Sequence, residues 1–264
     1  MNQRRRILQT LLSLPLAAAL PTHATPKQPL DMAGAINKAG RQRMLSQRIA
    51  KLHAQLLVNV YTKKALKLMD ASVALFDNQL RELKAFSPTP DIRGLYVRLE
   101  QLWEPYRSAA YAMPSIASLK QVAQLNEEVL QTAHAATMAL EKHSGTESSR
   151  LVNLSGRQRM LSQRAAKFYM FRTAGVGGAE VESGLATARK EFQAGLAELK
   201  KAPQNSEKIK RQLLLAENQW AFFAHALDNY TPGTQNVTHL EYVAASSENL
   251  LEVLDNVTGL YQSV

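Results

Sequence analysis

Residues 36–51 read INKAGRQRMLSQRIAK, and residues 152–167 read VNLSGRQRMLSQRAAK. Twelve of the 16 positions are identical between these two stretches, which lie 116 residues apart along the chain. A long stretch repeated in this way indicates duplication of a structural unit of about 115 residues. We call the two stretches the first and the second motif.

The duplication extends beyond the motifs. Trp103 corresponds to Trp220 at a spacing of 117, one residue more than the motif spacing. Other aromatic and aliphatic positions repeat at 116: Phe76, Leu80 and Leu83 against Phe192, Leu196 and Leu199. Such large apolar residues are most simply core anchors, so we expect both halves to fold alike.

Hydrophobic residues recur at helical spacing along most of the chain. We expect helices at 31–61, 65–86, 91–113, 115–143, 150–173, 180–201, 206–229 and 237–261. Asp31 can cap the first helix, and Pro105 should kink or end the third. The sequence therefore predicts an all-α protein of two tandem up-and-down four-helix bundles, about eight helices, with repeats at 31–145 and 146–264.

The first 24 residues have the composition of a cleavable export signal. A positive start at 1–6 precedes a short apolar run at 7–20 and small residues before position 25. Arg4 to Arg6 fit a twin-arginine signal, and an ordinary Sec signal is the alternative. Residues 25–30 form a polar linker. From the signal at 1–24 we expect a soluble protein exported to the periplasm.

The composition excludes several kinds of chemistry. The chain has no cysteine, which rules out thiolate catalysis, disulfides and cysteine-bound metals. The net charge is +10, or about +7 without Arg4 to Arg6, which suits an anionic ligand or an acidic partner. Export makes nucleic acid an unsuitable partner, and we expect no cofactor.

On a helix, the first motif has two distinct faces. One is an aliphatic core face: Leu45, Ile49, Leu52 and Leu56. The other carries Asn37, Gly40, Met44, Gln47 and Lys51, which resembles neither an aliphatic core nor an ordinary solvated surface. Glycine inside a helix costs about 1 kcal/mol relative to alanine, so Gly40 indicates close approach of a backbone or a ligand.

Arg43 lies one turn beyond Gly40, and its planar guanidinium suits a small planar oxyanion. Arg41 and Arg48 lie on another face, where pairing with carboxylates or water is the simpler interpretation. The polar positions are kept between the two motifs, whereas several apolar ones differ. The candidate ligand-binding residues are therefore Asn37, Gly40, Arg43 and Gln47 with their counterparts Asn153, Gly156, Arg159 and Gln163.

The motif resembles two related sensor families. The pattern Asn-Lys-Ala-Gly-x-x-Arg-Met-x-Ser-x-Arg is similar to the P-box of bacterial nitrate/nitrite sensor histidine kinases. The longer form Ala-Gly-Arg-Gln-Arg-Met-Leu-Ser-Gln-Arg, residues 39–48, resembles the PilJ-type domain at the N-terminus of type IV pilus chemotaxis transducers. The chain follows the PilJ pattern at Arg41, Gln42, Leu45 and Gln47. The resemblance implies an extracytoplasmic four-helix sensor domain in each repeat.

In the nitrate sensors, one arginine from each of two subunits grips a single nitrate across a twofold axis. By motif position, the resemblance assigns that role to Arg43 and Arg159. Our hypothesis is that the duplication places both halves of such a site in one chain. The alternative is a homodimer that pairs motif helices from two chains.

Anion binding has two alternatives, a helical interaction protein and an enzyme. A helical interaction protein would dock onto a membrane-bound receptor or a pilus or chemotaxis component and expose a large apolar patch. An enzyme is not indicated, because no nucleophile, paired-carboxylate or metal-ligand spacing stands out. His53, His134, His143, His225 and His239 show no metal-ligand pattern, and His53 should be a packed or surface side chain.

Overall fold

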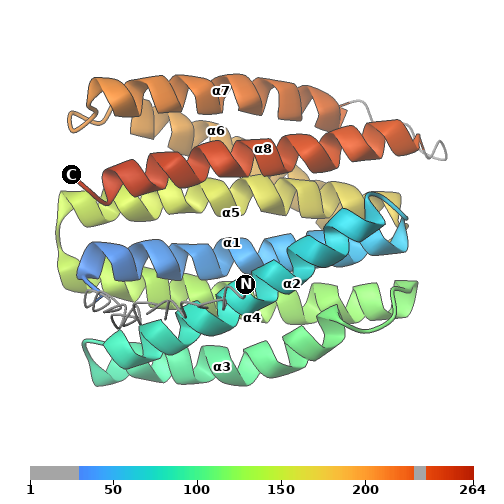
Figure 1. Cartoon of the computed structure of the whole chain (residues 1–264), viewed down its shortest axis with the longest axis horizontal. Helices are drawn as coiled ribbons and strands as arrows, with labels where there is room; N and C mark the ends of the chain where they lie inside the picture. The colour runs from blue at the N-terminus through green and yellow to red at the C-terminus, as the bar shows by residue number, and fades with distance from the viewer. Residues whose placement is uncertain (1–29, 229–235) are drawn as a thin grey trace, which may run out of the picture.

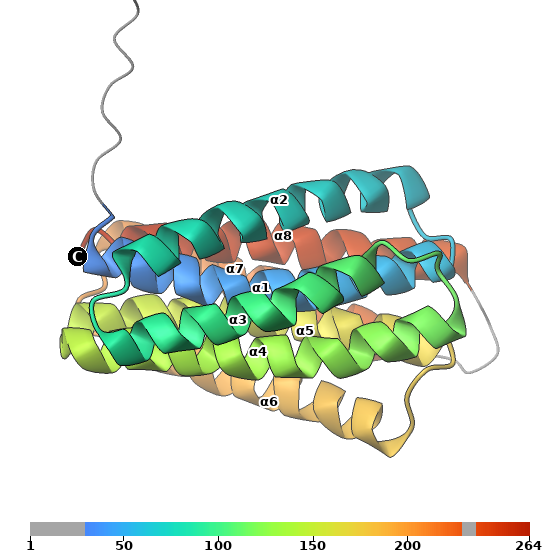
Figure 2. The same ribbon diagram turned by 90° about the horizontal axis from the view of Figure 1, so that it is seen from below.

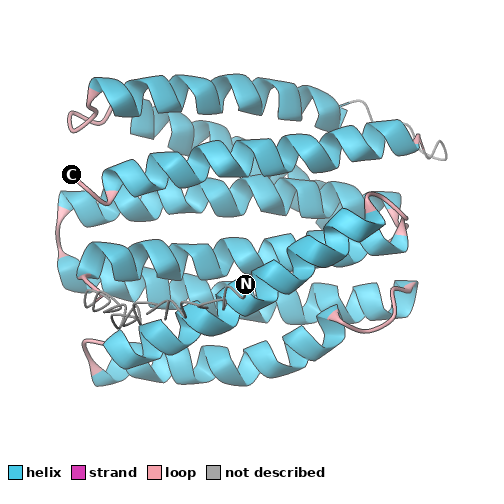
Figure 3. Ribbon diagram, in the orientation of Figure 1, coloured by secondary structure: helices cyan, strands magenta, loops and turns pink. Residues whose placement is uncertain are grey.

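The computed structural model describes residues 30–228 and 236–264, and these residues form eight α-helices and no strand (Figure 3). This confirms the predicted all-α class. The helices are α1 (Met32–Leu57), α2 (Thr62–Phe86), α3 (Pro90–Ala110), α4 (Ile116–Ser144), α5 (Glu147–Thr173), α6 (Ala179–Lys200), α7 (Glu207–Asp228) and α8 (Val237–Tyr261). The expected export signal at 1–24 and nearly all of the linker at 25–30 lie outside the described residues.

The two helices that carry the motifs, α1 and α5, lie side by side in the middle of the molecule (Figure 1). In this view, α3 and α4 lie below the pair, α2 crosses in front of α1 from lower left to upper right, and α6, α7 and α8 lie above the pair. The contact between α1 and α5 is the most extensive between any two helices. Each repeat therefore contributes one helix to a shared centre, and Figure 2 shows the helices running roughly along one direction.

Side-chain caps fix where the helices begin. Asp31 accepts a hydrogen bond from the backbone N–H of Gly34, as the sequence predicted. Thr89, Ser115 and Thr146 cap α3, α4 and α5 in the same way. Each cap satisfies one of the backbone donors left free at a helix start, so the short turns between helices are well defined.

Two helices end earlier than their sequence patterns suggested. The first ends at Leu57 rather than near 61, because Asn59 and Tyr61 adopt left-handed backbone conformations with φ of 57° and 49°. The third ends at Ala110 rather than 113. Pro105 lies inside that helix, which continues beyond it for another turn.

The repeated aromatic residues occupy equivalent places in the two cores. Phe76 stacks on Trp103 with ring centroids 3.8 Å apart, and Phe192 stacks on Trp220 at 3.9 Å. All four side chains are buried. Stacked pairs of this kind add to the free energy of apolar burial, so the core-anchor interpretation is confirmed. Within the part of the chain described here, no helix is long and apolar enough to cross a bilayer.

Candidate functional site

Both faces of the first motif are buried. Leu45, Ile49 and Leu52 pack in the core of the first repeat, as expected. The second face, which resembles neither an aliphatic core nor an ordinary solvated surface, is buried as well. The residues of this face are buried against the second motif, because α1 and α5 pack along these positions. They are Asn37, Gly40, Met44, Gln47 and Lys51. We call this interface between the two repeats the polar seam.

The two motif helices approach each other closely at Gly40 and Gly156. A Cβ on Gly40 would lie 3.7 Å from the Cα of Gly156, so the two backbones almost touch. The same point lies 3.3 Å from Nη2 of Arg43 and 3.6 Å from Nη2 of Arg159. The missing side chains therefore make room for two guanidinium groups that converge at the helix crossing.

Each arginine binds the asparagine of the other motif. Nη2 of Arg43 donates to Oδ1 of Asn153 at 2.6 Å, and Nη2 of Arg159 donates to Oδ1 of Asn37 at 2.8 Å. Each Nη2 also faces the backbone oxygen of the same asparagine. These reciprocal contacts relate the two motifs by an approximate twofold axis that passes between Gly40 and Gly156.

The two guanidinium groups are fully buried, with an exposed fraction of 0% for both Arg43 and Arg159. Burial, together with the nearby charges of Arg157 and Arg159, lowers the pKa of Arg43 to about 9. Burial lowers the pKa of Arg159 to about 10, with Asp255 opposing the shift. The Nε atom of each arginine has no hydrogen-bond partner within the described residues, so both groups keep unused donor capacity.

The two motif glutamines reach the last helix of a repeat. Nε2 of Gln47 donates to Oδ1 of Asn126 on α4 at 3.0 Å. Nε2 of Gln163 donates to the backbone oxygen of Ser247 on α8 at 2.9 Å. These glutamines lie along the seam beyond the arginine pair, so they fix α4 and α8 against the motif helices.

The motif lysines tie the two repeats together. Lys51 on α1 forms an ion pair of 2.5 Å with Glu248 on α8, and Lys167 on α5 forms one of 2.8 Å with Glu127 on α4. Both lysines are buried, and burial lowers the pKa of each, to about 8 for Lys167. The pairs cross from one repeat to the other in both directions.

The other motif arginines pair with acids, as the simpler interpretation predicted. Arg41 contacts Asp255 at 3.0 Å, and Arg48 forms an ion pair with Glu248. His53 is buried and hydrogen-bonded to the backbone of Ala110 and to Ser118, so it is a packed histidine.

Sequence reasoning missed the acidic and imidazole partners on α4 and α8. Nη1 of Arg159 donates to Asp255 at 2.5 Å, whereas Nη1 of Arg43 faces Nδ1 of His134 at 3.2 Å. The sequence signal that could have found these partners is the spacing between equivalent residues of the last helix in each repeat. The last helices align at 121 residues rather than 116, which matches Glu127 with Glu248 and His134 with Asp255.

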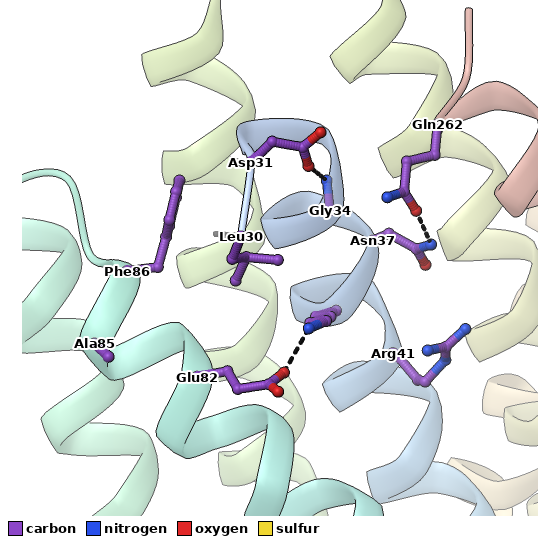
Figure 4. A pocket seen from close by; sticks show the side chains of 10 residues that line it. Leu30, Asp31, Gly34, Asn37, Arg41, Glu82, Ala85, Phe86 and Gln262 are labelled. Carbon is purple, nitrogen blue, oxygen red and sulfur yellow. Dashed lines mark hydrogen bonds and ion pairs between the residues drawn. The ribbon is translucent and has the colours of Figure 1, made fainter. Parts of the chain in front are cut away.

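Cavities lie beside the motif helices. One, of about 850 Å³, is at the start of α1, where Asn37 donates to Gln262 at 2.7 Å and Lys38 pairs with Glu82 (Figure 4). A second, about 650 Å³, lies between α1, α2 and α8, and a third, about 260 Å³, lies between α4, α5 and α6. Of the candidate residues, Arg43 lines the third cavity and Asn37 the first. Residues 30–228 and 236–264 contain no group of three or more side chains suited to hold a metal ion.

Comparison with known proteins agrees with this two-repeat architecture. The sequence matches the family described as type IV pili methyl-accepting chemotaxis transducer N-term, PilJ, in two segments, 25–134 and 143–245. Neither the curated proteins nor the solved structures include a match to the chain. The matched segments together cover most of the 264 residues, and each contains one motif. The chain belongs to the PilJ family of chemotaxis-transducer sensory domains and carries two copies of that domain.

Proposed function

We propose that this protein is an exported sensory module that binds a small, nitrate-like oxyanion between its two motif helices. The observation that carries the proposal is the meeting of two fully buried guanidinium groups, Arg43 and Arg159, beside the Gly40–Gly156 crossing. Two like charges about 6 Å apart repel by about 3 kcal/mol at an effective dielectric constant of about 20. An anion between them would turn this repulsion into attraction.

The other candidate residues have supporting roles in this proposal. Gly40 and Gly156 leave space for the arginines, and Asn37 and Asn153 hold them in place until an anion arrives. Gln47 and Gln163 keep the neighbouring helices in register. In this proposal the protein binds the anion reversibly and catalyses no reaction, which agrees with the sensory character of the family. The basic start at 1–6 and the apolar run at 7–20 support periplasmic export.

Titration calorimetry of the whole chain with nitrate, nitrite and acetate tests the proposal. We expect saturable binding, and a loss of at least about tenfold in affinity for Arg43→Lys, because lysine keeps the charge but not the planar fork. Thermal melting should show that the variant remains folded. Absence of heat and of any melting shift with every anion would overturn the proposal.

A second candidate function is docking onto a membrane-bound receptor or a pilus or chemotaxis component. The family description connects the domain with such transducers. Leu214 and Phe222 on α7 are 56% and 58% exposed and lie on one helical face, since they are eight residues apart. Exposed apolar side chains at such spacing suit a helical partner. Substituting both by serine should then abolish co-purification with the transducer while leaving anion binding unchanged.

A further inference from the structure

Two of the cavities are related by the approximate twofold axis between the repeats. The 260 Å³ cavity is lined by Arg157, Met160 and Arg164 of the second motif, and the 650 Å³ cavity by Arg41, Met44 and Arg48 of the first. Glu127 and Glu248 occupy matching positions on α4 and α8. We call them the Arg43 cavity and the Asp255 cavity, after the residue that distinguishes each.

The two cavities differ at one pair of equivalent positions. In the Asp255 cavity, the carboxylate of Asp255 covers Arg159, with Oδ1 2.5 Å from Nη1, and Arg159 is not part of the lining. In the Arg43 cavity, His134 stands at the corresponding position, and Arg43 lines the cavity. Arg43 thus lacks the carboxylate that its counterpart has.

His134 does not replace that carboxylate electrostatically. A guanidinium has donors only, so Nδ1 of His134 accepts the bond from Arg43 as a neutral ring. Burial and the charges of Arg43 and Arg157 lower the pKa of His134, which keeps the ring neutral. Arg43 therefore has a neutral partner where Arg159 has an anionic one.

The acids around the Arg43 cavity are already engaged. Glu191 pairs with Arg157 at 3.0 Å, and Glu127 pairs with Arg164 and Lys167. Glu141 raises the pKa of Arg43 from a distance, but its own hydrogen bond is with the amide of Asn153. The buried charge of Arg43 is thus left without a carboxylate in direct contact, which is costly unless a ligand supplies one.

We propose that the Arg43 cavity binds a short-chain carboxylate, whose carboxylate group displaces His134 from Nη1 of Arg43 and takes the place there that Asp255 takes beside Arg159. The inference rests on the proposed function in that both have an anion bind at the motif arginines, and it places that anion on the cavity side of Arg43. Leu130, Met160 and Ala188 give the cavity an apolar side that suits a short aliphatic tail. At about 260 Å³, the cavity is far larger than the roughly 30 Å³ that a water molecule occupies in the liquid.

An exchange of His134 and Asp255, the residues at equivalent positions beside the two arginines, tests the proposal, with acetate, propionate, butyrate and nitrate as probes in calorimetry. His134→Asp supplies an internal carboxylate and should weaken carboxylate binding by at least about tenfold. Asp255→His removes the internal carboxylate from the other half and should raise the stoichiometry from one to two per chain. Wild-type binding should be tighter for propionate or butyrate than for nitrate.

A steric test locates the ligand independently of charge. Thr187 is an exposed residue in the lining of the Arg43 cavity, and its counterpart on α2, Ala71, is exposed but lines neither cavity. Thr187→Trp should abolish binding, whereas Ala71→Trp should leave the affinity within about twofold of wild type. Melting curves should show both variants folded.

The outcomes separate this inference from the proposed function. Binding that survives Thr187→Trp, and that Arg43→Lys and Arg159→Lys weaken equally, would place the anion between the two arginines. That result would overturn the carboxylate cavity and leave the proposed function standing. No binding of any of the four anions to the wild-type chain would overturn both. Loss of binding in Thr187→Trp and His134→Asp, with retention in Ala71→Trp, supports the cavity.

Discussion

Gly40 is the residue whose environment depends most closely on the duplication. A Cβ at this position would lie 3.3 Å from Nη2 of Arg43, and that nitrogen is held by a 2.6 Å hydrogen bond to Asn153. The guanidinium cannot retreat without breaking this bond. An added methyl group is therefore expected to strain the arginine pair.

We predict that Gly40→Ala lowers the free energy of unfolding by about 1 kcal/mol. Overpacking typically costs about 1–3 kcal/mol of stability, and the better helix propensity of alanine offsets about 1 kcal/mol of that cost. Gly94→Ala is the matched control, because Gly94 lies in α3 and, outside the adjacent backbone of that helix, no described atom lies within 4 Å of its Cβ position. Urea unfolding should show the control stabilised by up to about 1 kcal/mol. Equal stabilisation of both variants would contradict the strained crossing.

At the residue scale, the sequence predicted part of the site and no more. Arg43 and Arg159 could be found because both belong to a motif written twice at one spacing. Asp255 and His134 could not, because a longer connection shifts the last helix of the second repeat relative to that spacing. Neither residue is conspicuous by itself, and only the fold brings them to the arginines.

Among the helices, the seam between α1 and α5 is unusual because four of its buried side chains are cationic. Lys51 and Lys167 are buried in it together with the two arginines. Helical patterning sorts faces by hydrophobicity, so a buried polar face is hard to recognise when its partners lie on another repeat. The aliphatic face and the eight helices could be predicted, because the hydrophobic pattern that indicates them lies within each segment and does not depend on the other repeat.

The buried lysines predict that the protein becomes more stable as the pH rises from about 8 to 9.5. Burial lowers the pKa of folded Lys167 to about 8, below the usual 10.5, so in this window the unfolded chain binds more protons than the folded one. Raising the pH then relieves the cost of the buried charge, and Lys51 and Arg43 act in the same direction. Tyrosine ionisation opposes this only near pH 10 and above.

Urea midpoints at pH 8 and 9.5 measure this effect. Lys167→Met should show a smaller rise than the wild-type chain, because one of the titrating groups is gone. Glu127 retains Arg164 as a partner at 3.1 Å in this variant, so the fold should persist. A midpoint that falls with pH in the wild type would contradict the prediction.

For the molecule as a whole, the shared centre predicts that both repeats unfold together. The most extensive helix contact joins them, and the Lys51–Glu248 and Lys167–Glu127 pairs cross between them. Trp103 reports on the first repeat and Trp220 on the second, since each is buried against a phenylalanine of its own repeat. Neither repeat should therefore lose its structure before the other.

Single-tryptophan variants can test this cooperativity. In Trp103→Phe and in Trp220→Phe, the fluorescence midpoint in urea should coincide with the far-ultraviolet circular dichroism midpoint of the same variant. A fluorescence transition that clearly precedes or follows the dichroism transition would show that the repeats unfold as independent domains.

The pairing of Asp255 with Arg159, and of His134 with Arg43, has a genetic consequence. In a symmetric homodimer, one codon specifies both equivalent positions, so both would carry aspartate or both would carry histidine. Here the two positions are encoded separately and carry different residues. Joining two copies in one reading frame allows each half to change alone. One half can therefore keep an internal counter-ion, as Asp255 is for Arg159, while the other half has a neutral residue at the equivalent position.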